Sequence, residues 1–370
     1  MKVLMVCSYG FKNSPTGAGT QVRETCAYLR KIGVDVRQIF VRFRPVVFEE
    51  EDSTPLSHEQ LLKLVEKYDV AHLIHCSKEM VVAWRPYVGT IPTLGSTIYW
   101  GGFERIAMAV KTFPPGLSMV KAILNFLREM SPLYNDFRGI KVFLPNSHAE
   151  AGVVSRYYRR DEESFLFPVP NGFVPPDYDP AMLPRCADIP FDDYIVVPGI
   201  FANRKNQLGL IKALRRSDYP VVFLGGRCDY NRALTWFFDR CKALATEKML
   251  FLGHVPSSSE RYWSVLAYAR CSCLASDCET PGIAMIESSY AGARPVITKF
   301  GGTSEYYGFD GEYFDPRSEK AIRSAVGRAW NRGRLTKEQS LAYARFSWRY
   351  CAEITLQAYE QALAVWGRGN

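Results

Sequence analysis

Residues 194–225 read YIVVPGIFANRKNQLGLIKALRRSDYPVVFLG. The apolar run Tyr194–Pro198 is typical of a buried strand, Gln207–Arg215 has the spacing of a helix, and Val221–Gly225 has the character of a second buried strand. A strand, a helix and a strand in this order form a βαβ unit, in which the two strands pair in parallel. The stretch therefore predicts a parallel sheet with helices packed on it.

The same alternation extends in both directions from this stretch. A Pro-rich run, FPVPNGFVPP at 167–176, interrupts it, and we interpret this run as a linker because it cannot form a helix. We predict an α/β protein in three parts: an N-terminal domain at 1–180, a C-terminal domain at 190–346 and a terminal helix at 347–370. The other expected strands are Val3–Cys7, Val34–Phe40, Val70–Ile74, Lys141–Leu144, Met249–Gly253, Cys271–Ala275 and Pro295–Thr298, and the other expected helices are Gln21–Ile32, Leu61–Lys67, Ala233–Ala245, Ser258–Ala269, Ile283–Ala291 and Ser347–Trp366.

The composition narrows the class of protein. A chain of 370 residues with 47% hydrophobic content can bury large cores, which excludes a disordered chain and a small disulfide-stapled scaffold. Its 10 cysteines stand at irregular positions, so we expect them to be reduced and the protein to be cytoplasmic. The net charge of +8 favours contact with phosphates, anionic substrates or an anionic membrane surface. The cations are not clustered as in nucleic-acid-binding modules, so no nucleic acid partner is expected.

Ligands of open α/β sheets bind beyond the carboxyl ends of the strands, so the loops that follow strands are the candidate sites. Two of these loops carry glycines: Ser14–Thr20 reads SPTGAGT and Gly301–Glu305 reads GGTSE. Backbone N–H groups in such loops can approach an anion closely. The first loop has the spacing of neither a dinucleotide-binding nor a P-loop motif, and a plain strand-to-helix turn explains it equally well.

Two further loops carry charges. One reads GIFANRKN and places Arg204 and Lys205 before a helix, where the dipole disfavours cations, so a bound diphosphate would account for them. The other reads SDCETPGIAMIESSYAG and places Glu279 in a strand-to-helix loop and Glu287 beside an apolar helix face. Sugar hydroxyls are suitable partners for such carboxylates. The alternatives are solvated cations in the first loop and, in the second, a Glu279 that aids the helix N-terminus and a surface Glu287.

A set of short motifs runs along almost the whole chain. It comprises Asn146-Ser147, Pro170-Asn171-Gly172, Lys205-Asn206, Phe251-Leu252-Gly253, the pair Glu279 and Glu287 with Pro281-Gly282-Ile283-Ala284 between them, Gly302 with Glu305, and Phe346-Ser347-Trp348. Together and in this order they resemble glycosyltransferase family 4, whose members are retaining enzymes of the GT-B fold. The resemblance implies two Rossmann-like domains facing a central cleft, with a C-terminal helix that crosses back to the N-terminal domain. It also implies a nucleotide-sugar donor, UDP- or GDP-linked, held mainly by the C-terminal domain.

The resemblance further implies roles for individual residues. Glu279 would bind hydroxyls of the donor sugar, Lys205 would neutralise the diphosphate, and Glu287 would bind the ribose, the first two being the catalytic residues. No metal or other cofactor is expected, because cations and helix N-termini take its place. The remaining donor contacts would come from Arg204 and from backbone N–H groups at Gly17 or Gly19, at Gly282, Ile283 and Ala284, and at Gly301, Gly302 and Thr303.

The chain departs from the family pattern at two places. It has Ile200 where the family usually has arginine, which leaves Arg204 as the second cation for the diphosphate. It has Ser96 and Thr97 near the position where the family often has histidine, and we assign both to acceptor binding. Elsewhere, His72 and His75 would point to opposite faces of a strand, so they are interpreted as core or loop residues rather than metal ligands.

The expected reaction transfers a hexose or similar sugar, with retention, to a glycan or lipid-linked acceptor in polysaccharide or cell-envelope synthesis. Phe103–Arg138 is rich in apolar residues and cations. This segment would either rest on an anionic membrane, which would make the protein peripheral at the inner face, or line a site for a soluble acceptor. The alternatives are a sucrose- or starch-synthase-like enzyme with a soluble acceptor, and a nucleotide-sugar-binding protein that has lost turnover.

Overall fold

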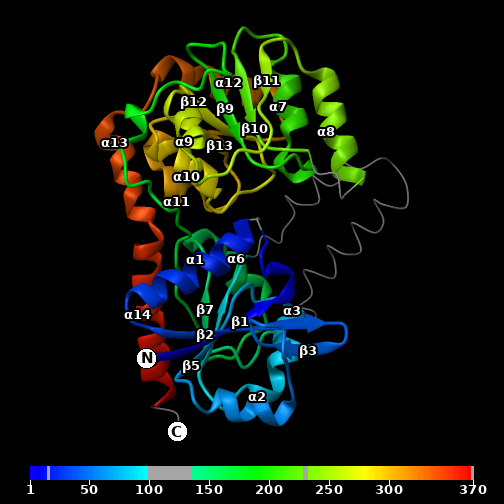
Figure 1. Ribbon diagram of the computed structural model, residues 1–370, viewed down its shortest axis with the longest axis vertical. Helices are drawn as coiled ribbons and strands as arrows, with labels where there is room; N and C mark the ends of the chain where they lie inside the picture. The colour runs from blue at the N-terminus through cyan, green and yellow to red at the C-terminus, as the bar shows by residue number, and fades with distance from the viewer. Residues whose placement is uncertain (15–16, 99–135, 228–231, 368–370) are drawn as a thin grey trace. The chain divides into compact units, whose positions relative to one another are not determined.

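The computed structural model describes residues 1–14, 17–98, 136–227 and 232–367 (Figure 1). Within these residues the chain divides into two compact units. Unit 1 contains residues 1–14, 17–98, 136–172 and 348–367, and unit 2 contains the described residues from 173 to 347. Unit 1 is therefore built from separate parts of the chain, whereas the described part of unit 2 comes from one stretch.

Unit 1 is built on one sheet with the strand order β4-β3-β2-β1-β5-β6-β7-β8. Strands β2, β1, β5, β6, β7 and β8 pair in parallel, each with its neighbour in this order. At the edge next to β2, strands β3 and β4 extend the sheet in antiparallel pairing. The strands are β1 (Lys2–Ser8), β2 (Asp35–Phe43), β3 (Val46–Glu49), β4 (Pro55–Leu56), β5 (Val70–Leu73), β6 (Thr93–Ser96), β7 (Val142–Leu144) and β8 (Phe165–Leu166). The helices are η1 (Tyr9–Phe11), α1 (Gly17–Lys31), α2 (His58–Val65), α3 (Lys78–Trp84), η2 (Arg85–Tyr87), α6 (His148–Tyr157) and α14 (Trp348–Trp366).

The sheet of unit 1 is buried on both faces. Its central strand β1 reads KVLMVCS, and residues 3–7 have no exposed surface. Alternate side chains of such a strand point to opposite faces. Val3 and Met5 pack in one apolar cluster with α1 and α14, and Leu4 and Val6 pack in another with α2 and α3. The sheet is thus the middle of three layers.

Helix α14 lies against α1 in unit 1, although the residues before it belong to unit 2. Its buried face carries Ala352, Ala358 and Ala362 among other residues. Tyr359 adds a polar contact, since its hydroxyl lies 2.7 Å from Nδ1 of His72 on β5. The small side chains allow close approach to the sheet, and the tyrosine fixes the helix at one position along it.

Unit 2 is built on a fully parallel sheet with the order β11-β10-β9-β12-β13-β14. Counted from its first strand, this is the 3-2-1-4-5-6 order of the Rossmann fold. The strands are β9 (Ile195–Pro198), β10 (Val221–Leu224), β11 (Met249–Phe251), β12 (Cys271–Leu274), β13 (Arg294–Thr298) and β14 (Glu312–Phe314). The helices are η3 (Pro180–Met182), η4 (Asn203–Lys205), α7 (Gln207–Leu214), α8 (Arg232–Leu244), α9 (Glu260–Ala267), α10 (Ile283–Tyr290), α11 (Thr303–Tyr307), η5 (Gly308–Asp310), α12 (Glu319–Arg332), α13 (Lys337–Leu341) and η6 (Ala342–Phe346).

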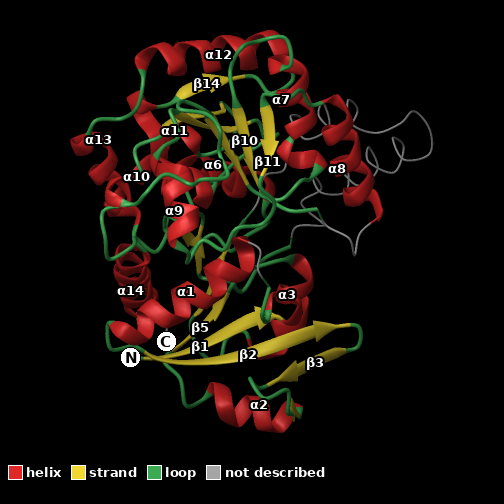
Figure 2. Cartoon of the chain, turned by 45° about the horizontal axis from the view of Figure 1, so that its top comes forward, coloured by secondary structure: helices red, strands yellow, loops and turns green. Residues whose placement is uncertain are grey.

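Helices also cover both faces of the sheet in unit 2 (Figure 2). Val196 and Val222 face α9 and α10, while Val197 and Val221 face α7, α8 and α12. At the centre of the sheet the chain changes direction: β9 leads to β10 on one side, and β12 leads to β13 on the other. The loops after β9 and β12 therefore diverge at the position where Rossmann-like sheets bind ligands.

The α/β prediction is confirmed, and each expected strand and helix is present with ends shifted by a few residues. Helix α1 starts at Gly17 rather than Gln21, because two glycines at its start disguise the first turn in the sequence. The antiparallel strands β3 and β4 were not expected. Their signal is weak, because each is short and β4 consists of Pro55 and Leu56 alone.

The close approach of β9 and β10 at their carboxyl ends gives a first prediction. A Cβ on Gly225 would lie 1.9 Å from the carbonyl oxygen of Gly199. Neither atom can rotate away, because the oxygen belongs to the backbone and the backbone fixes the position of the Cβ. Gly225→Ala should lower the free energy of unfolding by about 2 kcal/mol or more. The control is Gly327→Ala within α12, where the nearest atom is 3.5 Å away and alanine should raise stability by about 0.5–1 kcal/mol. Urea denaturation of both variants checks this, and a Gly225→Ala protein as stable as the wild type would contradict the close approach.

Candidate functional site

Lys205 and Glu279 meet at the point where the sheet of unit 2 changes direction. Lys205 ends η4, which follows β9, and Glu279 lies in the loop after β12. Their side chains form an ion pair with 2.5 Å between Nζ and Oε1, and are 14% and 7% exposed. The same Oε1 also accepts a hydrogen bond from Ser276. Two loops that diverge from the sheet are thus joined through one buried carboxylate.

Backbone contacts hold the loop after β9. Asn206 has the left-handed φ of 51° that ends η4 and starts α7, and its amide donates to the carbonyl of Pro316. The N–H of Asp277 donates to the carbonyl of Arg204, which ties this loop to the one after β12. Gln207 donates to the carbonyl of Ile200 and closes the loop on itself. Lys205 therefore stands on a braced turn.

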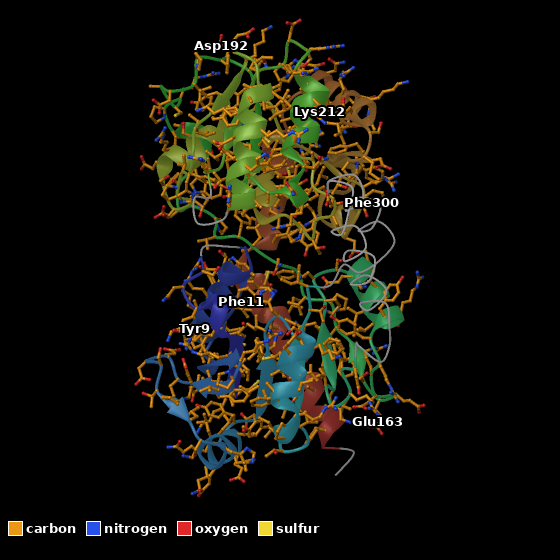
Figure 3. All side chains as sticks on the ribbon, turned by 90° about the vertical axis from the view of Figure 1, so that its right-hand side faces the viewer. Tyr9, Phe11, Glu163, Asp192, Lys212 and Phe300 are labelled. Carbon is orange, nitrogen blue, oxygen red and sulfur yellow. The ribbon has the colours of Figure 1, made fainter. Side chains whose placement is uncertain are left out.

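The loop after β13 braces Glu279 from the other side. The N–H of Glu279 donates to the carbonyl of Phe300, labelled in Figure 3, and the N–H of Gly302 donates to the carbonyl of Glu279. A Cβ on Gly301 would lie 2.1 Å from that same carbonyl oxygen, so glycine is required there. The expectation that Gly302 offers a free N–H to phosphate is therefore not met. Thr303 is fully buried, and its hydroxyl donates to the carbonyl of Thr298.

Glu279 is charged despite its burial. Burial alone would raise its pKa, but Lys205, the hydrogen bond from Ser276 and the charge of Arg204 outweigh it and lower the pKa. Arg204 itself is exposed, and Ile200 on the same loop is also exposed. The loop therefore offers one cation that is committed to Glu279 and a second that faces solvent. This arrangement can hold an anion if Lys205 exchanges partners.

Glu287 lies in a different environment. It is 9% exposed on α10, and one of its oxygens, Oε2, accepts a hydrogen bond from the hydroxyl of Tyr262 on α9. Burial raises its pKa to about 7, and the hydrogen bond from Tyr262 opposes the rise. The alternative that Glu287 is a surface residue is therefore wrong. The alternative that Glu279 serves only the helix N-terminus does not account for its ion pair with Lys205.

Gly282 connects the two acids. It has a φ of +75°, and a Cβ there would lie 2.9 Å from Leu274 and 3.3 Å from Oε2 of Glu279. Helix α10 begins directly after it, so the N–H groups of Ile283 and Ala284 belong to the first turn. The first N–H groups of a helix have no partner within the helix. These N–H groups lie four and five residues from Glu279 in the chain.

The structure places the predicted residues of unit 1 after its own strands. Gly17 and Gly19 start α1, and a Cβ on Gly19 would lie 2.2 Å from the carbonyl oxygen of Ser14. Ser96 and Thr97 are buried, with the Ser96 hydroxyl 2.7 Å from Nε2 of His72 and the Thr97 hydroxyl donating to Glu150. The hydroxyls predicted to bind an acceptor are therefore used inside the unit, and we base no acceptor assignment on them.

The two histidines have protein partners. His72 lies between Ser96 and Tyr359, and burial lowers its pKa to about 3. His75, with a φ of 55°, contacts the ring of Phe11, which is labelled in Figure 3, and the carbonyl of Ala18. Burial lowers the pKa of His75 to about 4. Both are therefore neutral near pH 7. His72 lies on β5 in the core, but His75 follows the end of the strand, so the expected placement of both on one strand is wrong for His75. Among the described residues no group of His, Cys, Asp and Glu side chains is arranged to hold a metal ion.

Most of the basic segment Phe103–Arg138 lies outside the described residues. At its described end, the guanidinium group of Arg138 donates two hydrogen bonds to the carboxylate of Asp136, at 2.9 and 2.7 Å. This cation therefore already has an anionic partner. Within the described parts of the chain, no helix has the length and apolar character needed to cross a membrane.

Sequence reasoning missed Ser276 and Tyr262. Ser276 lies three residues before Glu279, and this spacing could have identified it as a hydrogen-bond donor. Tyr262 lies on a different helix, 25 residues before Glu287, so no local pattern reveals it.

Comparison with known proteins agrees with this architecture. Residues 190–344 match the family model described as "Glycosyl transferases group 1", and they lie in unit 2. No curated protein sequence matches the chain. Similar solved structures include a sucrose-phosphate synthase from Thermosynechococcus elongatus (TM-score 0.69, 16% identity, 98% of this chain and 99% of that chain). Another is HepE from Anabaena in complex with UDP and glucose (TM-score 0.63, 14% identity, 98% of this chain and 100% of that chain). A third is the catalytic domain of starch synthase IV from Arabidopsis thaliana bound to ADP and acarbose (TM-score 0.62, 11% identity, 98% of this chain and 99% of that chain).

Identities this low show a shared fold and nothing beyond it. The fold is GT-B, in which two Rossmann-like domains make up one chain. The residues of unit 2 that match the glycosyl transferases group 1 model include Lys205, Glu279 and Glu287.

The buried ion pair gives a prediction about stability. Lys205→Met leaves the Glu279 carboxylate buried without its cation, which should lower the free energy of unfolding by about 3 kcal/mol. The double variant Lys205→Met/Glu279→Gln removes both charges and should lose less than the single variant. Urea denaturation of the wild type, both single variants and the double variant measures the coupling. Additive losses would show that the two residues do not stabilise each other.

Glu287 gives a prediction about pH. Its pKa is about 7 in the folded protein against 4.5 ordinarily, so the folded state binds the proton more tightly. The protonated carboxyl group of Glu287 therefore stabilises the folded state. This stabilisation is fully present below about pH 4.5, decreases as the pH rises to about 7 and is lost above that. Relative to wild type, Glu287→Gln should therefore gain about 3 kcal/mol between pH 4.5 and pH 8. Denaturation at both pH values tests this, and an unchanged difference between the two proteins would contradict the raised pKa.

Proposed function

We propose that the chain is a retaining glycosyltransferase that takes a hexose or similar sugar from a UDP- or GDP-linked donor. The observation that carries the proposal is the buried pair of Lys205 and Glu279 at the centre of the parallel sheet, with Glu287 on the helix that follows. The family match over 190–344 and the nucleotide-bound structures of the same fold support it. A diphosphate, a sugar and a ribose each find a complementary group among these three residues.

In this proposal the donor diphosphate replaces Glu279 as the ion-pair partner of Lys205. The ammonium group then contacts a phosphate oxygen instead of Glu279, and the exposed Arg204 adds a second positive charge in place of the arginine that Ile200 replaces. The first N–H groups of α10, at Ile283 and Ala284, face the same negative charge. Their task is to stabilise the leaving diphosphate, whose charge increases as the bond to the sugar breaks.

Glu279 is released by the same exchange. Its carboxylate is kept charged in a buried place, so it becomes an acceptor for the hydroxyls of the donor sugar when Lys205 turns to the diphosphate. The bond between the anomeric carbon and the phosphate oxygen breaks, and the acceptor oxygen bonds to that carbon on the same face. The proton of the acceptor hydroxyl passes to the departing phosphate oxygen. The configuration at the anomeric carbon is thereby retained, and no metal or other cofactor takes part.

The acceptor in this proposal is a glycan or a lipid-linked sugar, in polysaccharide or cell-envelope synthesis. The net charge of +8 and the basic composition of Phe103–Arg138 support an anionic membrane surface as a partner and a peripheral position in the cytoplasm. The similar structures of a sucrose-phosphate synthase and a starch synthase support a second candidate, transfer to a soluble acceptor. Activity with a lipid-linked acceptor but not with a soluble sugar separates the two.

Nucleotide release tests the donor half of the proposal. Wild type, Glu279→Gln and Lys205→Met are incubated with UDP-, GDP- and ADP-sugars without acceptor, with the exposed Glu247→Gln as the control. Wild type and control should release nucleotide from one donor class, and both site variants should release it about 100-fold more slowly or less. Equal release by all four proteins would contradict the assigned roles. Nucleotide binding without release, even after acceptors are screened, would indicate a binding protein that lacks turnover.

A further inference from the structure

The two oxygens of Glu287 have different surroundings. Oε2 accepts the hydrogen bond from Tyr262, at 2.5 Å. Among the described residues no protein group donates to Oε1. A carboxylate held by one oxygen and open at the other can accept from a pair of neighbouring hydroxyls, using Oε1 and the second lone pair of Oε2. The vicinal diol of a ribose is such a pair.

Tyr262 is fixed independently of Glu287. It is the third residue of α9, and its N–H donates to the side chain of Ser259, which caps the helix. Its ring is 6% exposed and meets the ring of Trp263 edge to face, with centroids 5.8 Å apart. Burial raises the pKa of its hydroxyl well above 10, so the hydroxyl keeps its proton and acts as the donor. A phenylalanine would fill the same space and remove that donor alone.

The other charged groups near α10 have partners other than Glu287. Lys337 pairs with Asp179, Arg294 donates to the carbonyl of Gly333, and Arg345 lies over the ring of Phe346. Two causes shift the pKa of the Glu287 carboxyl group: its burial and the hydrogen bond from Tyr262. Tyr262 is the group with this effect among the elements that pack against α10. The titratable and charged groups on those elements are Glu260, Arg261 and Tyr262 on α9, Cys271 and Cys273 on β12, Arg294 on β13, Lys337 and Glu338 on α13, and Tyr343 and Arg345 on η6.

We propose that Tyr262 is a positioning residue that holds Glu287 as the ribose-selective acceptor of the nucleotide site. The inference rests on the proposed function, because it takes the ribose of the donor nucleotide as the ligand of Glu287. The hydroxyl of Tyr262 orients the carboxyl group and favours its charged form, and the charged form accepts both hydroxyls of the diol. A nucleotide without these hydroxyls gains nothing from the arrangement, so the pair of Tyr262 and Glu287 distinguishes ribose from dideoxyribose.

The test compares Tyr262→Phe with wild type and with Tyr268→Phe. Tyr268 is a matched control, since its half-buried hydroxyl donates to the carbonyl of Leu183, whereas the hydrogen bond to Glu287 comes from Tyr262. Each protein is titrated with UDP, GDP and ADP and with their 2′,3′-dideoxy counterparts, from about pH 6 to about pH 9, a range that spans the raised pKa of Glu287. Melting temperatures are recorded for all three proteins.

Wild type and Tyr268→Phe should bind the ribonucleotide more tightly than its dideoxy counterpart, with an affinity that rises through about pH 7 as Glu287 loses its proton. Tyr262→Phe should lose about tenfold in affinity for the ribonucleotide at neutral pH and little for the dideoxy form. Its affinity should also rise at a higher pH than that of wild type, because the carboxylate has lost the bond that favours its charged form.

Each contrary result identifies what fails. Wild type that binds none of the three nucleotides overturns the proposed function and this inference together. If wild type prefers the ribonucleotide and Tyr262→Phe shows the same preference and the same pH dependence, the inference alone is overturned. Equal losses for both forms of nucleotide, together with a lower melting temperature, would show that Tyr262 acts by packing, and this outcome also overturns the inference.

Discussion

The site depends on one ion pair, between Lys205 and Glu279. It is the place where the loops after β9 and β12, which leave the sheet in opposite directions, are held together. Charges of this kind are stable in a buried place only as partners. A ligand that takes Lys205 from Glu279 must therefore supply an anion in its place. In the proposed function the phosphates of the sugar diphosphate are that anion, and the sugar hydroxyls donate hydrogen bonds to the carboxylate of Glu279.

The two acids of the site illustrate how surroundings divide one chemical group into two functions. Glu279 and Glu287 are eight residues apart and both are buried, yet the pKa of the first is lowered and that of the second is raised to about 7. The difference is the partner: a lysine in one case and a neutral tyrosine in the other. The carboxyl group of Glu279 is therefore charged near neutral pH, whereas that of Glu287 exchanges its proton at about pH 7.

Much of the fold was predictable because it follows from short-range patterns. Buried parallel strands such as Ile195–Pro198 are continuous apolar runs, and the helices between them are periodic. The positions of Lys205 and Glu279 followed from the rule that ligands bind after strands. Their direct contact did not, because 74 residues separate them and only the strand order brings them together. For the same reason the sequence did not reveal the burial of Ser96 and Thr97 or the use of the Gly302 N–H by Glu279.

The discontinuity of unit 1 affects how the protein is made. The described part of unit 2 is one continuous stretch, so it can fold as soon as residue 347 has left the ribosome. Unit 1 must wait for α14, since the apolar face of its sheet that carries Val3 and Met5 is completed by that helix. During synthesis this face is exposed while about 175 further residues, the length of unit 2, are added. This face of β1 is thus fully covered only after unit 2 has been made, and a chaperone that binds apolar segments would find its target there.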